Sequence, residues 1–221
     1  MIISLSIDAC GPIFRIGRRP NPWEPLDWSL AGADGTFGNR FDDLEATYRV
    51  LYASSQRLGC YLETLARFWV DIKLYAELGE IAGEDDFVPR GVVPPEWAEK
   101  RMIGAAEHEE SYADLYGSEW IGILRRELAP DCLALRLNDL DAAILQASAP
   151  RRLTQRASRI AFQAGFDGIH YRSRYGHDVQ NWALFEPFKL NPGRPMAIEK
   201  NDPDLERALA IHALRFADVE R

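Results

Sequence analysis

The longest regular pattern of apolar side chains in the 221-residue chain runs from Arg57 to Leu78. Apolar residues recur there at intervals of three and four, the spacing that lines one face of an α-helix. They are Leu58, Leu62, Leu65, Trp69, Ile72 and Tyr75. The pattern predicts one long amphipathic helix packed against a core, with Glu63 at the margin of the apolar stripe.

Shorter patterns predict further helices and several strands. Helices are expected at 118–128, from Asn138 or Asp139 to Gln146, at 153–164 and at 203–216. Ser118 is the expected N-cap of the 118–128 helix, and Pro130 its expected stop. Strands are expected at 1–11, 12–16, 48–52, 100–105, 132–137, 168–171 and 181–185. Because strands and helices alternate unevenly, the order favours a mixed α/β or α+β fold over a regular series of βαβ units.

The charge and the composition restrict the class of protein. The formal net charge is −8, whereas a general nucleic-acid binder needs an excess of basic side chains. The three cysteines are far apart in the sequence, which fits a reducing compartment and gives no disulfide framework. We expect Cys60 to be a small buried side chain. No run of about 20 apolar residues is present and the N-terminal residues lack a basic signal-peptide region, so a soluble cytoplasmic protein is predicted.

Well-known catalytic and cofactor motifs are absent from the sequence. There is no GxGxxG after a predicted strand, no GxxxxGK[ST] and no GxSxG, which argues against a Rossmann fold, a P-loop and an α/β-hydrolase triad. The run from His108 to Ser111 lacks the HExxH spacing of a zinc site. We therefore predict neither a metal nor a cofactor.

A set of polar residues lies beside the predicted strands. They are Arg15, Arg40, Tyr52, Glu63, Ser173, Arg174, His177 and Asn181. Arginine binds phosphate through forked donors, and a carboxylate near a sugar stabilises a cationic transition state at the anomeric carbon. This combination suggests a phosphate-bearing substrate with a glycosidic bond.

Two blocks of sequence resemble the RES domain family. The first, at 40–65, contains RF, YRVLYAS and ETL, and the second, at 153–185, contains GFDGIHYRSRYG and NWALF. The PIFRI segment at 12–16 resembles the family's first strand. Where the family often has Trp-Asn after its arginine, this chain has Phe41 and Asp42, and the region 79–117 is longer than a minimal family member needs.

The resemblance implies a fold and an activity. The expected fold is α+β, with the mixed or antiparallel sheet of ADP-ribosyltransferases surrounded by helices. The family includes bacterial toxins that destroy NAD, with an Xre-type helix-turn-helix antitoxin as partner. The resemblance further implies a single RES-type domain over 1–221, with a core at about 12–190, a helical insertion at about 79–128 and a C-terminal helix at about 203–217.

The resemblance also implies roles for individual residues. Arg40, Tyr52, Glu63 and Ser173 would be the catalytic residues, and Arg15, Arg174 and Asn181 would bind substrate. NAD would be the substrate and not a cofactor, and its nicotinamide–ribose bond would be cleaved by a glycohydrolase or phosphorylase reaction.

Several alternatives stay open on the sequence. The acceptor is water or phosphate, or a macromolecule in an ADP-ribosyltransferase reaction, and a non-catalytic nucleotide-binding module is a further alternative. The apolar stripe of the last predicted helix suits packing on the sheet, a homo-oligomer interface or an antitoxin surface.

Overall fold

A nine-stranded sheet forms the centre of the computed structural model, which describes residues 6–8, 11–81, 90–109, 111–147 and 149–217. The strands lie in the spatial order β1, β6, β7, β8, β3, β2, β5 and β10, and β9 also pairs with β5. They are β1 (Ser6–Asp8), β2 (Ile13–Arg18), β3 (Val50–Ser54), β5 (Arg101–His108), β6 (Ser111–Asp114), β7 (Gly168–Arg172), β8 (Gln180–Phe185), β9 (Leu190–Pro192) and β10 (Met196–Ala197). All of these pairings are antiparallel except that of β6 with β7. This mixed, mostly antiparallel sheet with helices around it confirms the predicted α+β class.

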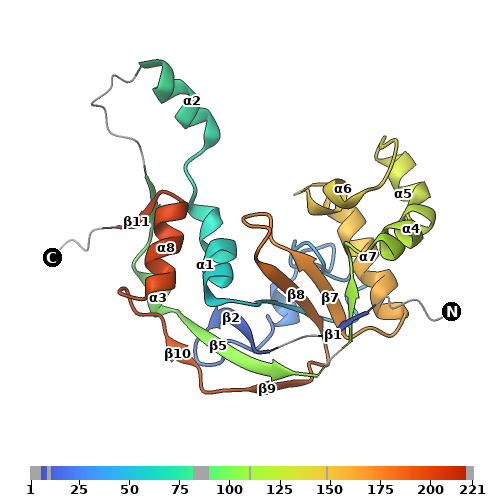
Figure 1. Cartoon of the computed structure of the whole chain (residues 1–221), viewed down its shortest axis with the longest axis horizontal. Coiled ribbons are helices and arrows are strands. Elements are labelled where there is room, and N and C mark those ends of the chain that lie inside the picture. The colour runs from blue at the N-terminus through green and yellow to red at the C-terminus, as the bar shows by residue number, and fades with distance from the viewer. Residues whose placement is uncertain (1–5, 9–10, 82–89, 110, 148, 218–221) are drawn as a thin grey trace.

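The helices form two groups, one at each side of the sheet (Figure 1). One group contains α1 (Arg57–Leu65) and α8 (Pro203–Ile211), which pack side by side. The other contains α4 (Ser118–Glu127), α5 (Ala129–Ala134), α6 (Ala142–Gln146) and α7 (Arg151–Gln163). Short helices η1 (Trp28–Leu30) and α3 (Glu96–Glu99) lie in the loops before β3 and β5. A second, parallel sheet joins β4 (Gly91–Val93) to β11 (Leu214–Phe216).

Buried apolar side chains hold each helical group to the sheet. On α1, Leu58, Leu62 and Leu65 are buried in one cluster with Leu205 of α8. On the other side, Leu153 and neighbouring residues of α7 pack into a cluster with strands β7 and β8. Burial of this kind is the main favourable term in folding, and here it fixes α1 and α7 relative to the strand ends between them.

Most strand predictions are confirmed. The segments predicted at 12–16, 48–52, 100–105, 168–171 and 181–185 overlap β2, β3, β5, β7 and β8. Within β2 the side chains alternate as expected, because Phe14 and Ile16 join one apolar cluster and Ile13 joins another. Part of the predicted 1–11 strand is β1, while residues 1–5 and 9–10 lie outside the described residues.

The prediction of one helix from 57 to 78 is wrong. The α-helix stops at Leu65, a 3-10 turn η2 (Ala66–Phe68) follows, and a separate helix α2 (Ile72–Ile81) begins beyond it. Trp69 has an extended ψ of 145°, and the carboxylate of Asp71 accepts a hydrogen bond from the Lys73 backbone at 2.9 Å. An Asx side chain that accepts this bond starts a new helix instead of continuing the old one. α2 then projects away from the body of the protein (Figure 1).

Two other predicted elements differ from the structure. The predicted strand 132–137 is wrong, because Ala129–Ala134 is helix α5, which has Pro130 in its first turn and buries Cys132 in the apolar cluster around α4. The final helix ends at Ile211, short of the predicted 217, and the chain turns at Ala213, whose φ of +50° lies outside the helical region. The following residues form β11 instead.

The described residues of the segment 79–128, expected as a helical insertion, supply three strands, β4, β5 and β6, and β5 pairs with β2 along six residues of the central sheet. The predicted N-cap Ser118 is wrong, because Gly117 precedes α4. The helix expected to start at Asn138 or Asp139 starts at Ala142, where Asp141 caps it through a hydrogen bond from the Ile144 backbone at 2.8 Å. Among the residues that the structure describes, no helix is both long enough and apolar enough to span a membrane.

Candidate active site

A cleft of about 440 Å³ opens where β3 ends and α1 begins. Its walls come from the middle of β2, from the ends of β3, β7 and β8, from α1, from the turn at Asn39 and Arg40, and from the segment that joins α6 to α7. Six of the seven predicted site residues line this cleft: Arg15, Arg40, Tyr52, Glu63, Arg174 and Asn181. The seventh, Ser173, contacts Glu63 directly. His177, another polar residue noted in the sequence, is exposed and is not part of the cleft lining.

Glu63 is held by two donors from neighbouring strands. The Ser173 hydroxyl donates to Oε1 of Glu63 at 2.7 Å, and the Asn181 amide donates to the same oxygen at 2.8 Å. Both donors are buried, with exposed fractions of 2% and 1%. Within the described residues no hydrogen-bond donor reaches Oε2. The carboxylate is therefore fixed through one oxygen, and the other is available to a ligand in the cleft.

The sheet brings these donors to Glu63. Ser173 follows the last residue of β7, and Asn181 pairs with Ser54 at the end of β3, three residues before α1 begins at Arg57. The Ser173 hydroxyl also accepts a hydrogen bond from the Tyr175 backbone at 3.0 Å. The β7–β8 loop is thus connected to the Glu63 carboxylate through a single serine.

Arg15 lies inside the wall of the cleft. Its Nε donates to the Pro22 carbonyl at 2.7 Å and its Nη1 to the Tyr52 carbonyl at 2.8 Å. Burial lowers the pKa of Arg15 to about 10, so the guanidinium is still charged at neutral pH. In the described part of the chain, no carboxylate lies within ion-pair distance of Arg15. Among the described residues the hydrogen-bond partners of this half-buried charge are carbonyl groups, an arrangement that favours an anionic ligand.

Arg40, another residue of the cleft lining, packs against two aromatic rings that also contact each other. Its guanidinium carbon lies 5.2 Å from the centre of the Phe41 ring and 5.4 Å from that of Tyr171. Nη2 donates to the Leu145 carbonyl and, at 3.3 Å, to the Tyr116 hydroxyl. These contacts hold the side chain in place at the cleft wall, as a preorganised anion site requires.

Helix α7 fixes the backbone on which Arg40 lies. The Thr154 hydroxyl donates to the Arg40 carbonyl at 2.6 Å, and the Ser158 hydroxyl donates to the Phe41 carbonyl at 2.7 Å. The glycine-containing turn before Arg40 is therefore held against a regular helix, although it has no regular structure itself.

Tyr52 and Tyr171 are the aromatic residues of the inner cleft. The Tyr52 hydroxyl accepts a hydrogen bond from the Phe41 backbone at 2.9 Å. Burial raises the pKa of both tyrosines well above the usual value, so both are protonated at neutral pH. The Tyr52 proton is consequently available for donation to a ligand.

Some cleft residues were not predicted. Tyr171, Tyr175, Asn39 and Arg151 line the cleft together with the predicted set. Tyr171 stands in a mostly buried strand, where its sequence pattern is that of any core aromatic. The other three belong to loops or to a helix start, where a single sequence carries no signal that separates ligand contact from solvent exposure.

Cys60 is close to the cleft, and its environment keeps it unreactive. Its thiol donates to the Phe14 carbonyl at 3.1 Å, and burial raises its pKa to about 12. Only the thiolate is an effective nucleophile. The prediction that Cys60 is a small buried side chain is confirmed. The described residues also contain no cluster of three His, Cys, Asp or Glu side chains placed to hold a metal ion.

The protein is thus an α+β protein with a cleft in which the Glu63 carboxylate is held in place among arginine and tyrosine side chains. The RES domain family model matches residues 12–199, so the chain belongs to the RES domain family. No curated protein matches the sequence. A chain in the crystal structure of the M. tuberculosis MbcT–MbcA toxin–antitoxin complex has a similar fold, with a TM-score of 0.52. The similarity covers 94% of this chain and 92% of that chain at 10% sequence identity, and at this identity it concerns the fold alone.

Proposed function

We propose that the protein cleaves the nicotinamide–ribose bond of NAD. The observation that carries the proposal is the Glu63 carboxylate, held through Oε1 by Ser173 and Asn181, with Oε2 available to the cleft. Cleavage of this bond develops positive charge on the ribose carbon and its ring oxygen. A carboxylate fixed before the reaction stabilises that charge without having to reorganise.

The arginines suit the rest of such a substrate. Four arginines and a single carboxylate line the cleft, although the whole chain has a net charge of −8. Arg15 and Arg40 both line the cleft and would bind the pyrophosphate. Arginine binds phosphate oxygens through two parallel hydrogen bonds, which also fixes the position of the ligand.

The chemical step would use the remaining residues as follows. The carbon–nitrogen bond breaks, and its electron pair leaves with nicotinamide. Tyr52 would orient the nicotinamide ring through its hydroxyl, and Glu63 Oε2 would accept hydrogen bonds from the ribose hydroxyls. An oxygen of water or inorganic phosphate then bonds to the ribose carbon and water gives up a proton. NAD is consumed as a substrate, and no cofactor or metal is required.

Family membership and the fold shared with a toxin–antitoxin complex support a biological role. We infer that this chain is the toxin of a bacterial pair and that its partner is an Xre-type helix-turn-helix protein. Growth arrest on expression of the chain, relieved by co-expression of such a partner, would support this role.

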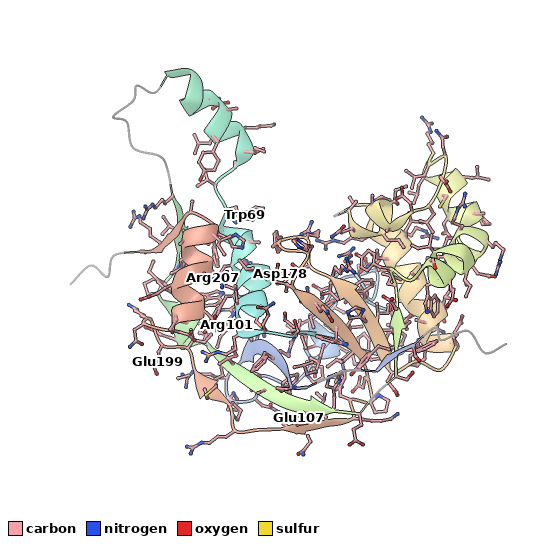
Figure 2. The ribbon with its side chains drawn as sticks, in the orientation of Figure 1. Trp69, Arg101, Glu107, Asp178, Glu199 and Arg207 are labelled. Carbon is pink, nitrogen blue, oxygen red and sulfur yellow. The ribbon has the colours of Figure 1, made fainter. Side chains whose placement is uncertain are left out.

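The test of the chemistry is NAD consumption by the purified protein and by Glu63→Gln. The amide keeps the size of the side chain and removes its charge, so kcat is expected to fall at least about 100-fold, as when one preorganised electrostatic group is lost. Glu107→Gln, an exposed position on β5 away from α1 (Figure 2), is the matched control and retains full activity. Equal turnover by Glu63→Gln and wild type would overturn the proposal. Mass spectrometry of the products identifies free ADP-ribose, its phosphorylated form or a modified macromolecule, and so identifies the acceptor.

A further inference from the structure

Three rings, those of Trp69, Tyr175 and His212, form a cluster beside the cleft, and Tyr175 is the one of them that lines it. Trp69 packs edge-on against Tyr175, with ring centres 5.1 Å apart, and against His212 at 4.8 Å. His212 also contacts Tyr175 at 5.5 Å and is held by a hydrogen bond between its Nε2 and the Leu62 carbonyl at 2.9 Å. The cluster is therefore anchored to α1, the helix that carries Glu63.

Trp69 is the most exposed of the six tryptophans. Its exposed fraction is 48%, whereas four of the others are between 2% and 6% exposed. Trp28, at 36%, is covered by the stacked ring of Phe37. Figure 2 shows Trp69 where the chain leaves α1 toward α2. Half of a large aromatic surface is thus presented to solvent by a rigid, packed side chain.

The same place carries a positive charge. The Arg174 guanidinium lies 5.3 Å from the centre of the Tyr175 ring, and its Nη2 donates to the Tyr175 hydroxyl at 2.9 Å. Both residues line the cleft. Aromatic rings beside an arginine are the features by which proteins hold a nucleotide base and its phosphate, because the base stacks on the ring and the guanidinium pairs with the phosphate.

We propose that Trp69, Tyr175 and Arg174 form a subsite for an adenine nucleotide, the AMP half of the dinucleotide. This inference rests on the proposed function for the identity of the whole substrate. In NAD the nicotinamide ring is cationic, so the charge of Arg174, which has no ion-pair partner among the described residues, disfavours it at this subsite and favours neutral adenine. The inner cleft with Tyr52 and Tyr171 then receives nicotinamide, and Glu63 meets the nicotinamide–ribose bond.

The role of His212 is to position the rings and not to touch the ligand. It is 7% exposed and contacts both rings of the subsite. Residues 203–216, which supply α8, His212 and β11, lie beyond the part of the chain that the family model matches. The ring cluster therefore depends in part on a segment that lies outside the matched region.

The experiment compares two ligands that differ in the base. AMP and nicotinamide mononucleotide each carry one ribose and one phosphate, and their dissociation constants are measured by isothermal titration with wild type, Trp69→Ala and Ile72→Ala. Ile72 is 82% exposed and three residues from Trp69, so Ile72→Ala is the matched control. NAD turnover is measured on the same three proteins, and thermal unfolding shows whether each is folded.

The expected result is specific for adenine. Trp69→Ala weakens AMP binding about tenfold and raises KM for NAD by the same factor, within the range of roughly 5- to 150-fold for one base–aromatic stack. Its kcat changes less than about twofold, and the affinity for nicotinamide mononucleotide does not change. Trp69→Phe, which keeps an aromatic face, recovers most of the loss, and Ile72→Ala behaves as wild type.

Other results separate the two proposals. An unchanged affinity for AMP in Trp69→Ala, or equal losses for both ligands, overturns the subsite and leaves the proposed function standing. Wild-type protein that binds AMP through Trp69 but does not consume NAD overturns the proposed function and leaves an adenine-nucleotide subsite.

Discussion

Removal of the two donors that hold Glu63 tests whether its orientation, and not only its presence, supports catalysis. Ser173 and Asn181 each donate a hydrogen bond to the same carboxylate oxygen, at 2.7 and 2.8 Å. A hydrogen bond to a charged group contributes about 1.5–3 kcal/mol. If this energy is realised in the transition state, Ser173→Ala and Asn181→Ala each lower kcat roughly 10- to 150-fold.

The double variant carries further information. Because both donors bind Oε1, the carboxylate is already released to rotate once one of them is gone. The second substitution should therefore cost less than the first, and a double-mutant cycle on kcat should give a coupling energy of about 0.5–3 kcal/mol. Independent, additive losses would refute the interpretation that the two side chains act as one clamp.

Ser173 has a second contact that separates the two single variants. Its hydroxyl also accepts a hydrogen bond from the Tyr175 backbone, which supports the proposed adenine subsite. Ser173→Ala should therefore raise KM for NAD in addition to lowering kcat, whereas Asn181→Ala should lower kcat alone. Ser55→Ala is the control, since its hydroxyl accepts from the Gln180 backbone at 3.3 Å and does not line the cleft. Single variants with wild-type kcat would refute the role of the clamp.

Two further predictions concern stability. Gly59→Ala places a methyl carbon 2.2 Å from Ser54 Oγ and 2.6 Å from Val179 Cγ1, and the overpacking, about 1–3 kcal/mol, outweighs the gain of about 1 kcal/mol in helix propensity. Urea unfolding should show that Gly59→Ala is less stable than wild type, and its NAD turnover should fall as α1 moves. A Gly59→Ala variant more stable than wild type would contradict this prediction. Burial lowers the pKa of His108, so the unfolded chain binds the proton first and stability is lost as pH falls below about 6.5. His108→Gln should reduce this loss of stability, whereas His177→Gln, at an exposed position, should not. Equal slopes of the free energy of unfolding against pH for wild type and His108→Gln would contradict the prediction.

Periodicity identified the parts of the fold that are regular over their whole length. The α7 helix and strands β2, β3, β7 and β8 lie where apolar spacing places them. The same rule failed where a local polar contact decides the structure. Apolar spacing continues through Trp69 and Ile72, but the Asp71 carboxylate caps a new helix there and both apolar side chains are exposed. Spacing reports which residues share a face, and it does not report whether anything covers that face.

The central residues of the site were predicted from motifs in two distant blocks. Glu63 and Ser173 are 110 residues apart in sequence, and they meet because β8 pairs with β3 on one side and β7 on the other. No local rule gives that strand order. Tyr171 and Tyr175 were missed for a related reason. The contact of Tyr171 with Arg40 depends on the direction of its strand, and the contact of Tyr175 with Trp69 depends on where the α1 helix stops. Neither feature can be read from the sequence.

The net charge of the chain bears on its affinity for long polyanions but not on the binding of a small ligand in the cleft. The value of −8 argues against general affinity for polyanions, which depends on charge summed over an extended surface. The cleft nevertheless carries four arginines, and Arg15, half-buried in its wall, donates to two carbonyl groups and has no carboxylate partner among the described residues. Surface charges more than about 8 Å apart are largely screened at physiological salt, whereas a partly buried charge is screened much less. A small dianionic ligand in the cleft therefore responds to its arginines and very little to the acidic exterior. The same charge distribution that argues against binding of a long nucleic acid is compatible with selective binding of a dinucleotide.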